Sequence, residues 1–393
     1  MNPFKINTII KYRWRLLLTA ALLFANAAQL QGMPGLIDAL VENNALTEEQ
    51  ARDLREQMAR SRPTVEPAGT NFRDFRIRGR IQTQFGYTNV SNDEISEDYS
   101  TLELRRVRLG ARGHLLQNVR AQLEANLLPN GFSMRSAFLQ WREHDAAHIK
   151  VGFDKPTFGF EEITSSASIL TVERTLINNT VAPGAQLGVA IDGSQDRFSY
   201  GAGVYTDRAN MNPAGEPARH LYNLSAGVNL GDLIGNGQDL DFRADFIASD
   251  DGGGNFGGAF KNGISVSGHY VRGPFDLRTE FITVEDRAED NTYGWYIMPS
   301  LYFTDKIQGV LRYEEAYSDD DFGLRAASRY ARQAPGLDND RGDTYRAIYA
   351  GANYYFAGDA NKVMGGVELS QLDDTADGDL KATTVYGAWR VLF

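Results

Sequence analysis

The chain has 393 residues and a formal net charge of −11 at pH 7, and it contains no cysteine. The missing cysteines exclude a disulfide scaffold, a thiolate nucleophile and a metal site built from thiolates. The acidic balance argues against nucleic acid as a partner.

The first 27 residues have the pattern of a cleaved secretory signal peptide. A basic stretch precedes the apolar run 16–25, which is too short to span a membrane as a helix. Ala25 and Ala27 place small residues where a signal peptidase reads them, so we expect cleavage after Ala27. Removing the four basic residues of this segment changes the net charge from −11 to −15. No later stretch is apolar for eighteen residues, so no transmembrane helix is predicted.

Residues 28–71 are predicted to form a short periplasmic helical segment followed by a linker. Apolar residues recur at helical spacing over 34–60, and Thr47 with Gln50 has the spacing of a capping box. Prolines and a glycine in 61–70 indicate the linker. A plug or spacer and a coiled coil that joins subunits are both compatible with this pattern.

From residue 72 the period changes from 3.6 to 2. Residues 75–87 alternate apolar or aromatic side chains with charged or polar ones over thirteen residues. Strands of globular proteins usually have about five or six residues, whereas a tilted membrane strand needs roughly 9–11. The same pattern recurs over 106–115, 119–127, 134–143, 147–153, 185–192, 197–205, 220–230, 239–249, 262–272, 274–284, 293–303, 307–317, 344–356, 362–370 and 381–393, which gives sixteen candidate strands.

The connections between these strands alternate in length. Those after even-numbered strands are short, as at 116–118, 144–146, 193–196, 273 and 304–306. Those after odd-numbered strands are long, as at 88–100, 154–184, 206–219, 250–261 and 318–343, with 128–132 and 231–238 as exceptions. Short periplasmic turns and long external loops are typical of outer-membrane barrels. The sequence therefore predicts an all-β fold: a sixteen-stranded antiparallel transmembrane β-barrel over residues 72–393.

The last predicted strand, 381–393, ends on the aromatic residue Phe393. A barrel must pair its last strand with its first, because an open edge cannot be left in hydrocarbon. The terminal aromatic resembles the signal by which bacterial barrel proteins are recognised for assembly. We therefore expect Phe393 to be the barrel-assembly terminus.

Two segments resemble a known family. The early-strand sequence of 104–110 (LRRVRLG) and the loop sequence of 151–166 (VGFDKPTFGFEEITSS) look like those of the porin O/P family, the phosphate-selective porins. The short stretches 172–174 and 181–184 continue the match. The resemblance implies a bacterial outer-membrane barrel, assembled as a homotrimer, whose third external loop folds into the lumen. The loop at 154–184 is the third external connection and the longest one.

Seven arginines are predicted on the lumen face of three successive strands: Arg76, Arg78, Arg80, Arg106, Arg108, Arg112 and Arg120. Neighbouring strands lie about 4.8 Å apart, so these side chains would form a basic wall. Guanidinium groups suit phosphate and carboxylate geometry, which favours an anion-attracting channel lining. The alternative is that lumen carboxylates such as Glu124, or the inserted loop, neutralise the wall.

The inserted loop is expected to form the constriction, with Lys155, Glu161, Glu162, Glu173 and Arg174. Between Lys155 and Arg174 it has no basic residue. Phosphate-selective relatives would be expected to place cations there as well, so this loop argues against phosphate specificity. An acidic loop facing the arginine wall would create a transverse field, which favours small polar or zwitterionic solutes over one anion.

No catalytic, cofactor or metal site is predicted. His144 and His148 have a metal-ligand spacing but flank a predicted turn, and the other histidines lie on distant strands, so a hydrolase is disfavoured. We therefore expect an outer-membrane porin for passive diffusion of small anionic or polar solutes, in contact with membrane lipid and lipopolysaccharide. The open alternative is a structural or adhesive barrel whose external loops bind a partner.

Overall fold

The computed structural model describes most of the predicted barrel and a small part of the chain before it. The described residues are 41, 47–52, 73–93, 96–128, 131–206, 220–235, 237–250, 260–286, 288–320, 323–325, 330, 341–375 and 378–393. The chain divides into two compact units, residues 1–72 and 73–393. The predicted signal peptide, most of the helical segment and the linker lie outside the described residues.

In the first unit the structure shows both hydrogen bonds of the predicted capping box. Thr47 Oγ1 accepts from the backbone N–H of Gln50 at 3.2 Å, and Gln50 Oε1 accepts from the backbone N–H of Thr47 at 2.9 Å. Residues 48–52 are helical. No helix in the described part of the chain is long and apolar enough to cross a membrane.

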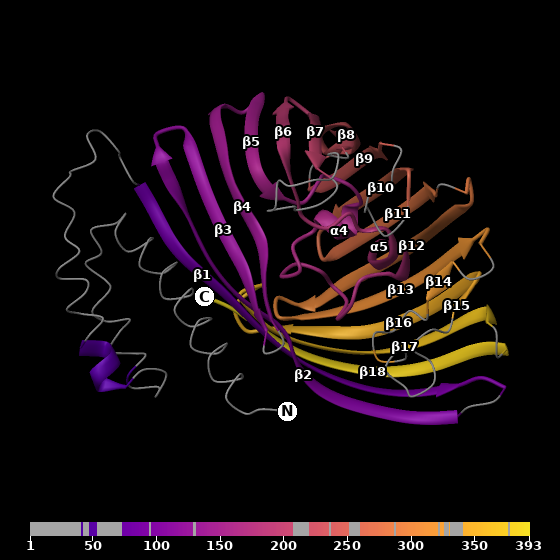
Figure 1. Cartoon of the computed structure of the whole chain (residues 1–393). Helices are drawn as coiled ribbons and strands as arrows, with labels where there is room; N and C mark the ends of the chain where they lie inside the picture. Colours follow the sequence, from indigo (N-terminus) through magenta and orange to yellow (C-terminus); the bar gives the residue numbers. More distant parts are fainter. Residues whose placement is uncertain are drawn as a thin grey trace, which may run out of the picture. The chain divides into compact units, whose positions relative to one another are not determined.

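The second unit is a closed antiparallel barrel of sixteen strands, as predicted (Figure 1). Its strands are β1 Arg73–Ser91, β2 Ser96–Leu116, β3 Val119–Leu128, β4 Gly131–His144, β5 Ala147–Asp154, β6 Gln186–Gln195, β7 Phe198–Thr206, β8 His220–Asn229, β9 Gln238–Ser249, β10 Asn262–Arg272, β11 Phe275–Glu285, β12 Asn291–Thr304, β13 Ile307–Ser318, β16 Thr344–Tyr355, β17 Asn361–Thr375 and β18 Gly378–Leu392. Each strand pairs with its neighbours along the chain, and β1 closes the barrel on β18.

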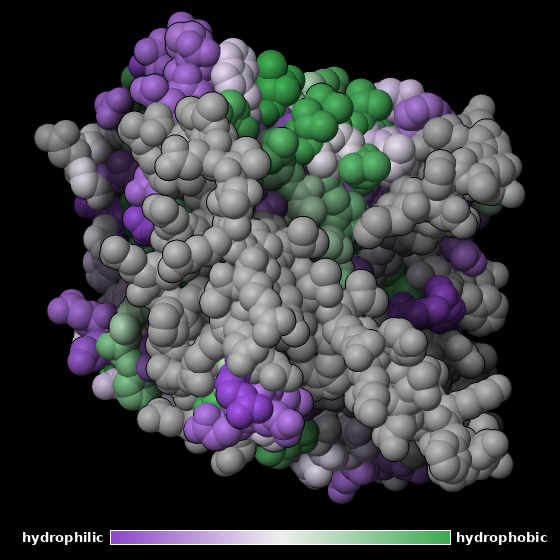
Figure 2. All heavy atoms as spheres, turned by 60° about the vertical axis from the view of Figure 1, so that its left-hand side comes forward, coloured by the Kyte–Doolittle hydropathy of each residue, from purple (hydrophilic) through white to green (hydrophobic). Residues whose placement is uncertain are grey.

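The alternation seen in the sequence separates an apolar outer face from a polar inner one. On β1 the outward side chains Ile81 and Phe85 are 43% and 42% exposed, whereas Gln82 and Gln84 between them are fully buried inside. Figure 2 shows one stretch of the apolar outer surface as green atoms. Such a surface is stable against lipid rather than water, because half of every strand presents hydrocarbon-like side chains.

The chain terminus completes this closure. The backbone N–H of Gly79 donates to the carbonyl of Phe393 at 2.6 Å, and the N–H of Phe393 donates back to Gly79 at 3.2 Å. The ring of Phe393 lies directly over Gly79 on the outer face, where a Cβ would clash with it. The last residue is therefore part of the β1–β18 seam.

Four connections differ from the prediction, and one of them, 371–380, is mostly strand because β17 runs to Thr375 and β18 starts at Gly378. The expected first external loop, 88–100, is mostly strand: β1 runs to Ser91 and β2 starts at Ser96. Polar side chains continue the ladder there, and Asn89 Nδ2 donates to Asp98 Oδ1 at 2.7 Å. The long turn 231–238 contains the helix α6, Gly231–Ile234, and the loop 318–343 contains a two-stranded sheet, β14 Leu324–Arg325 with β15 Arg341–Gly342.

The long loop between β5 and β6 lies inside the barrel. It forms two short helices, α4 Phe160–Ile163 and α5 Leu176–Val181, which Figure 1 shows within the ring of strands. Phe158, Ile177 and Val181 of this loop pack in one buried cluster with inward side chains of the barrel such as Ile282 and Ala316. The core of the molecule is therefore the inserted loop against one side of the lumen.

Candidate functional site: the lumen and its inserted loop

Barrel-wall carboxylates hold the amino ends of both loop helices. At α4, Glu280 accepts the backbone N–H of Phe160 at 2.5 Å and of Glu161 at 3.2 Å. At α5, Glu314 accepts the backbone N–H of Leu176 at 2.7 Å. The first N–H groups of a helix have no partner within the helix, and the dipole favours an anion beside them. These two contacts fix the loop to the β11–β13 side of the lumen.

A buried arginine connects the same side of the wall to the loop. Arg312 donates to Glu314 at 2.9 Å and to Glu368 at 3.0 Å, and its side chain is only 1% exposed. The same guanidinium donates to the loop at Thr171 Oγ1 (3.1 Å) and at the carbonyl of Glu173 (2.9 Å). Arg312 thus forms ion pairs with two wall carboxylates and binds the loop with the same group.

Further along the loop, three backbone carbonyls face donors of the wall. Ala167 accepts from Arg390 at 3.1 Å, Ile169 from Lys362 at 3.2 Å and Leu170 from Asn353 at 2.9 Å. The donors belong to β18, β17 and β16, so the contacts continue around the barrel from the α4 and α5 anchors. The loop is therefore held along its length, and one side of the lumen is filled.

Of the three acidic side chains of the loop, Glu161 and Glu173 do not line the open side of the lumen, so only Glu162 faces the same space as the arginine wall. Glu161 accepts from the backbone and hydroxyl of Thr175, both at 2.8 Å. Glu162 forms an ion pair with Lys155, and Arg174 lies 3.5 Å from its other oxygen. Both carboxylates are buried. A loop this long buries its charged groups against its own polar atoms, which parity along a strand cannot predict.

The third acidic residue, Glu173, is bound by the wall instead. Arg105 Nε lies 2.7 Å from Glu173 Oε1, and Gln84 donates to the same oxygen at 2.8 Å. Burial alone would raise the pKa of Glu173, but the charge and hydrogen bonds of Arg105 outweigh it and hold that pKa well below its usual range. Glu173 is therefore ionised and paired.

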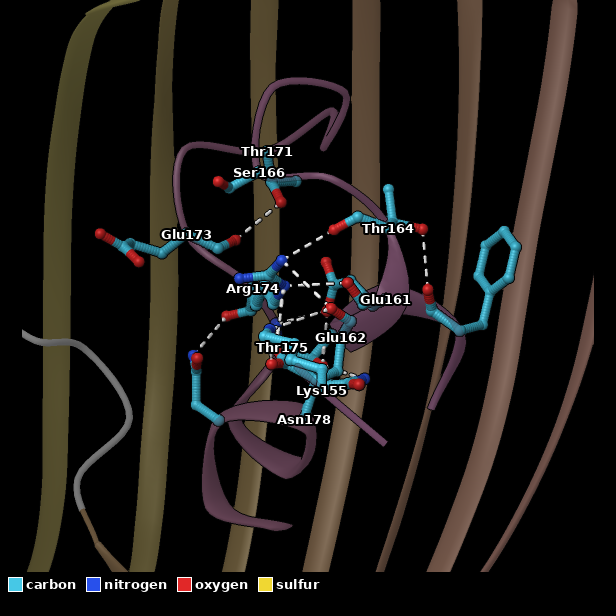
Figure 3. A network of polar contacts seen from close by, with 12 residues as sticks. Lys155, Glu161, Glu162, Thr164, Ser166, Thr171, Glu173, Arg174, Thr175 and Asn178 are labelled. Carbon is cyan, nitrogen blue, oxygen red and sulfur yellow. Dashed lines mark hydrogen bonds and ion pairs between the residues drawn. The ribbon is translucent and has the colours of Figure 1, made fainter. Parts of the chain in front are cut away.

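Arg174 stabilises the loop internally rather than facing the solute. Its guanidinium donates to the carbonyls of Glu161 at 2.9 Å and Thr164 at 2.8 Å (Figure 3). Lys155 likewise reaches back to Glu162 within the loop. Both cations predicted for the constriction are thus engaged by loop atoms.

The opposite side of the lumen is an open cavity of about 650 Å³. Eight cationic side chains line it, Arg78, Arg80, Arg108, Arg120, Arg135, Lys150, Lys155 and Arg243, together with four carboxylates, Glu124, Asp154, Glu162 and Asp192. In a low-dielectric cleft, an excess of one sign of charge raises the local concentration of counter-ions. The geometry fits a basic passage beside a docked loop.

Only four of the seven arginines of the predicted wall line the cavity. Arg78, Arg80, Arg108 and Arg120 line the cavity, and Arg80 and Arg108 both donate to Ser166 at the tip of the loop. Arg106 is buried against Gln82, with a hydrogen bond of 2.9 Å. Arg76 and Arg112 lie opposite each other in the register of β1 and β2, and neither lines the cavity.

The sequence matches the family model described as phosphate-selective porin O and P over residues 75–365. The chain belongs to this family. The chain is also similar to an uncharacterized protein of Caulobacter vibrioides, with 26% identity over 173 residues, which are 44% of this chain. The match spans about a third of the length of that relative.

Solved structures share the fold of this porin. The outer membrane channel DcaP of Acinetobacter baumannii superposes with a TM-score of 0.54 and 15% identity, covering 84% of this chain and 99% of that one. The anion-selective porin of Comamonas acidovorans gives 0.57 and 13%, covering 81% and 99%. The trimer form of OmpT of Vibrio cholerae gives 0.54 and 13%, also covering 81% and 99%. The protein is a sixteen-stranded barrel of the outer membrane.

Two arginines of the porin lumen are not predicted when every second residue of a strand is assigned to the lumen face. Arg105 and Arg135 occupy positions that face outward in a regular strand, but β2 and β4 each contain a register shift there. A β-bulge inserts one residue and redirects a side chain, often beside functional sites. Arg105 consequently binds Glu173, and Arg135 lines the cavity 3.9 Å from Glu124.

The alternative that lumen carboxylates neutralise the wall holds only in part. Glu124 lies 3.9 Å from both Arg108 and Arg135, so one carboxylate serves two guanidiniums. Lys150 pairs with Asp154 at 2.8 Å, and His148 with Asp192 at 3.0 Å.

Within the described ranges no group of three or more histidine, aspartate and glutamate side chains could hold a metal ion.

Proposed function

We propose that this protein is a passive outer-membrane porin, assembled as a homotrimer, that favours small anions without being specific for phosphate. One observation carries the proposal: the open side of the lumen has an excess of cationic side chains, whereas the acidic side chains of the loop are buried and paired. Family membership and fold point to a channel rather than an enzyme.

Two comparisons support this reading. The family description names phosphate-selective porins, and a structure with the same fold is titled an anion-selective porin. Another with this fold is titled a trimer form, which supports the homotrimer. Export by the segment 1–27, followed by folding of 72–393 in the outer membrane, is part of the same proposal.

The loop argues against phosphate specificity. A selective phosphate site needs several donors aimed at one position. Here Lys155 and Arg174 are bound to Glu162 and to loop carbonyls, and the residues between them supply no other cation. Basic attraction therefore comes from the barrel wall, which is spread over several strands and suits weak, general anion preference.

The test is the reversal potential in planar bilayers under a potassium chloride gradient. We expect the reversal potential to lie towards the equilibrium potential of chloride. Arg135→Gln should move it towards zero, because this change removes a cationic side chain that lines the cavity. Lys381→Gln removes the same charge from an exposed position outside the cavity and serves as the control. A cation preference would refute the proposal, and a folded barrel without conductance would favour the adhesive alternative.

A further inference from the structure

A second, smaller cavity of about 350 Å³ adjoins the basic one. Ile163, Ser199 and Arg243 line both, so the two spaces meet there. The small wall residues Gly227 and Ser267 leave room for it. A solute that follows the basic wall therefore reaches this side pocket without crossing the docked loop.

The side pocket has an apolar floor, in contrast to the polar wall of the main cavity. Phe160 and Ile163 of α4 provide it. The ring of His269 lies across from Phe160, with centroids 5.8 Å apart and planes tilted by 44°. Aromatic and branched side chains bind apolar groups through area removed from water. A small inorganic ion would gain no binding energy from contact with these apolar side chains.

Arg243 stands where the two cavities meet and is held in one orientation. Its Nε donates to Asp245 Oδ1 at 2.8 Å, and Asp245 is itself buried and accepts the backbone N–H of Gly159 at 3.2 Å. Within the described part of the chain, the two terminal nitrogens of Arg243 donate no hydrogen bond. A fixed guanidinium with its terminal nitrogens free can bind a carboxylate in bidentate fashion.

The far end of the side pocket disfavours a second negative charge. Asp196 and Asp241 line it, with Arg197 as the cation of that end. Asp241 accepts from Asn229 Nδ2 at 2.9 Å, so it is fixed inside the pocket. Two carboxylates against one guanidinium repel the distal end of a dianion.

We propose that this junction is a binding site for monocarboxylates with an apolar body, aromatic or branched. The carboxylate binds the terminal nitrogens of Arg243, and the apolar body lies on Phe160 and Ile163. The site rests on the proposed anion-favouring channel and gives it a preferred class of solute, which differs from phosphate in carrying a single charge and a hydrophobic end.

The probe is benzoate compared with acetate, each added to channels that carry a chloride current in planar bilayers. The two ions have the same charge, so their ratio isolates the apolar contact. We expect benzoate to halve the chloride conductance at roughly a tenth of the acetate concentration, since partial burial of a phenyl ring is worth about tenfold in affinity. Equal potency of the two ions in the wild type would overturn the site.

Variants place the two halves of the ligand. Phe160→Ser and Ile163→Asn should each bring the benzoate-to-acetate ratio towards one, and Arg243→Gln should weaken both ions. Leu233→Ala removes an exposed apolar residue of α6 that lines neither cavity, and the ratio should stay as in the wild type.

Two outcomes separate the site from the channel on which it rests. If the benzoate-to-acetate ratio kept its wild-type value in both Phe160→Ser and Ile163→Asn, the proposed site would be overturned. The anion-selective channel would not be affected by that result. A cation-selective reversal potential in the wild type would instead overturn the proposed function. Heat-modifiable mobility in gels confirms that each variant has formed its barrel before currents are compared.

Discussion

Removing the buried guanidinium of Arg312 should be the most damaging single change on the lumen side of the wall. In Arg312→Met, Glu314 and Glu368 remain 3% and 5% exposed without their cation, and the loop loses its contacts at Thr171 and Glu173. Removing one partner of a buried ion pair costs about 3–5 kcal/mol, because the other charge stays buried. We expect a loss of that size in the free energy of unfolding.

The assay is denaturant unfolding of the refolded protein, followed by tryptophan fluorescence. Arg346→Gln is the matched control: Arg346 also bridges a carboxylate, Asp373, at 2.8 Å, but it is 47% exposed on the outer face. An exposed pair of this kind contributes about 0–1 kcal/mol. A loss below about 1 kcal/mol for Arg312→Met, equal to the control, would refute the reasoning.

A triple variant sharpens the interpretation. Arg312→Met combined with Glu314→Gln and Glu368→Gln removes the stranded charges together with their partner, and much of the lost stability should return. The lost contacts with the loop do not return with it. The triple variant should therefore remain noisier than the wild type in single-channel records, which separates the effect on the wall from the effect on the loop.

Two further predictions concern the loop and the seam. Arg105 holds the pKa of Glu173 below its usual range, so the pair contributes stability above the ordinary carboxylate pKa of about 4.3 and loses it only as the pH falls through the lowered value. In Arg105→Gln the effect of burial dominates and raises the pKa of Glu173. Channel noise should therefore increase between pH 7 and pH 5 in the variant and not in the wild type. Identical pH profiles of the two proteins would contradict this. Gly79→Ala should displace the ring of Phe393 and slow formation of the heat-modifiable barrel, whereas Gly365→Ala, whose Cβ would lie 3.7 Å from the nearest atom, should fold at the wild-type rate. Equal folding rates would show that the seam tolerates a displaced terminus.

The barrel could be predicted because alternation and loop length are local properties of the sequence, and closure follows from the need to pair the two edge strands in hydrocarbon. The alternation on β1 places Gln82 inside and Ile81 outside without knowledge of any partner strand. The position of a side chain along the barrel axis is different, because it depends on strand tilt and stagger. Parity therefore placed Arg76 and Arg78 on one wall, although only Arg78 reaches the cavity.

The loop lay beyond prediction for another reason. Its acidic residues are expected to face the arginine wall because the loop inserts into the lumen, but each carboxylate is bound by a particular donor. Glu161 depends on Thr175, fourteen residues away, and Glu173 depends on Arg105 on another strand. Buried charges must find such partners. Which partner is near follows only from the folded path of the chain.

The two bulge arginines were predictable in principle, because the outer face records each inserted residue. Leu102 and Leu104 face outward, and the next outward side chains are Val107 and Leu109, so the spacing lengthens once from two residues to three. An outer face must stay apolar, so the break in spacing requires an extra residue that faces the lumen, and that residue is Arg105. Around Arg135 the outward residues Met134 and Ala137 show the same three-residue step. Counting the spacing of lipid-facing residues, rather than extending one parity along the strand, would therefore have placed both arginines in the lumen.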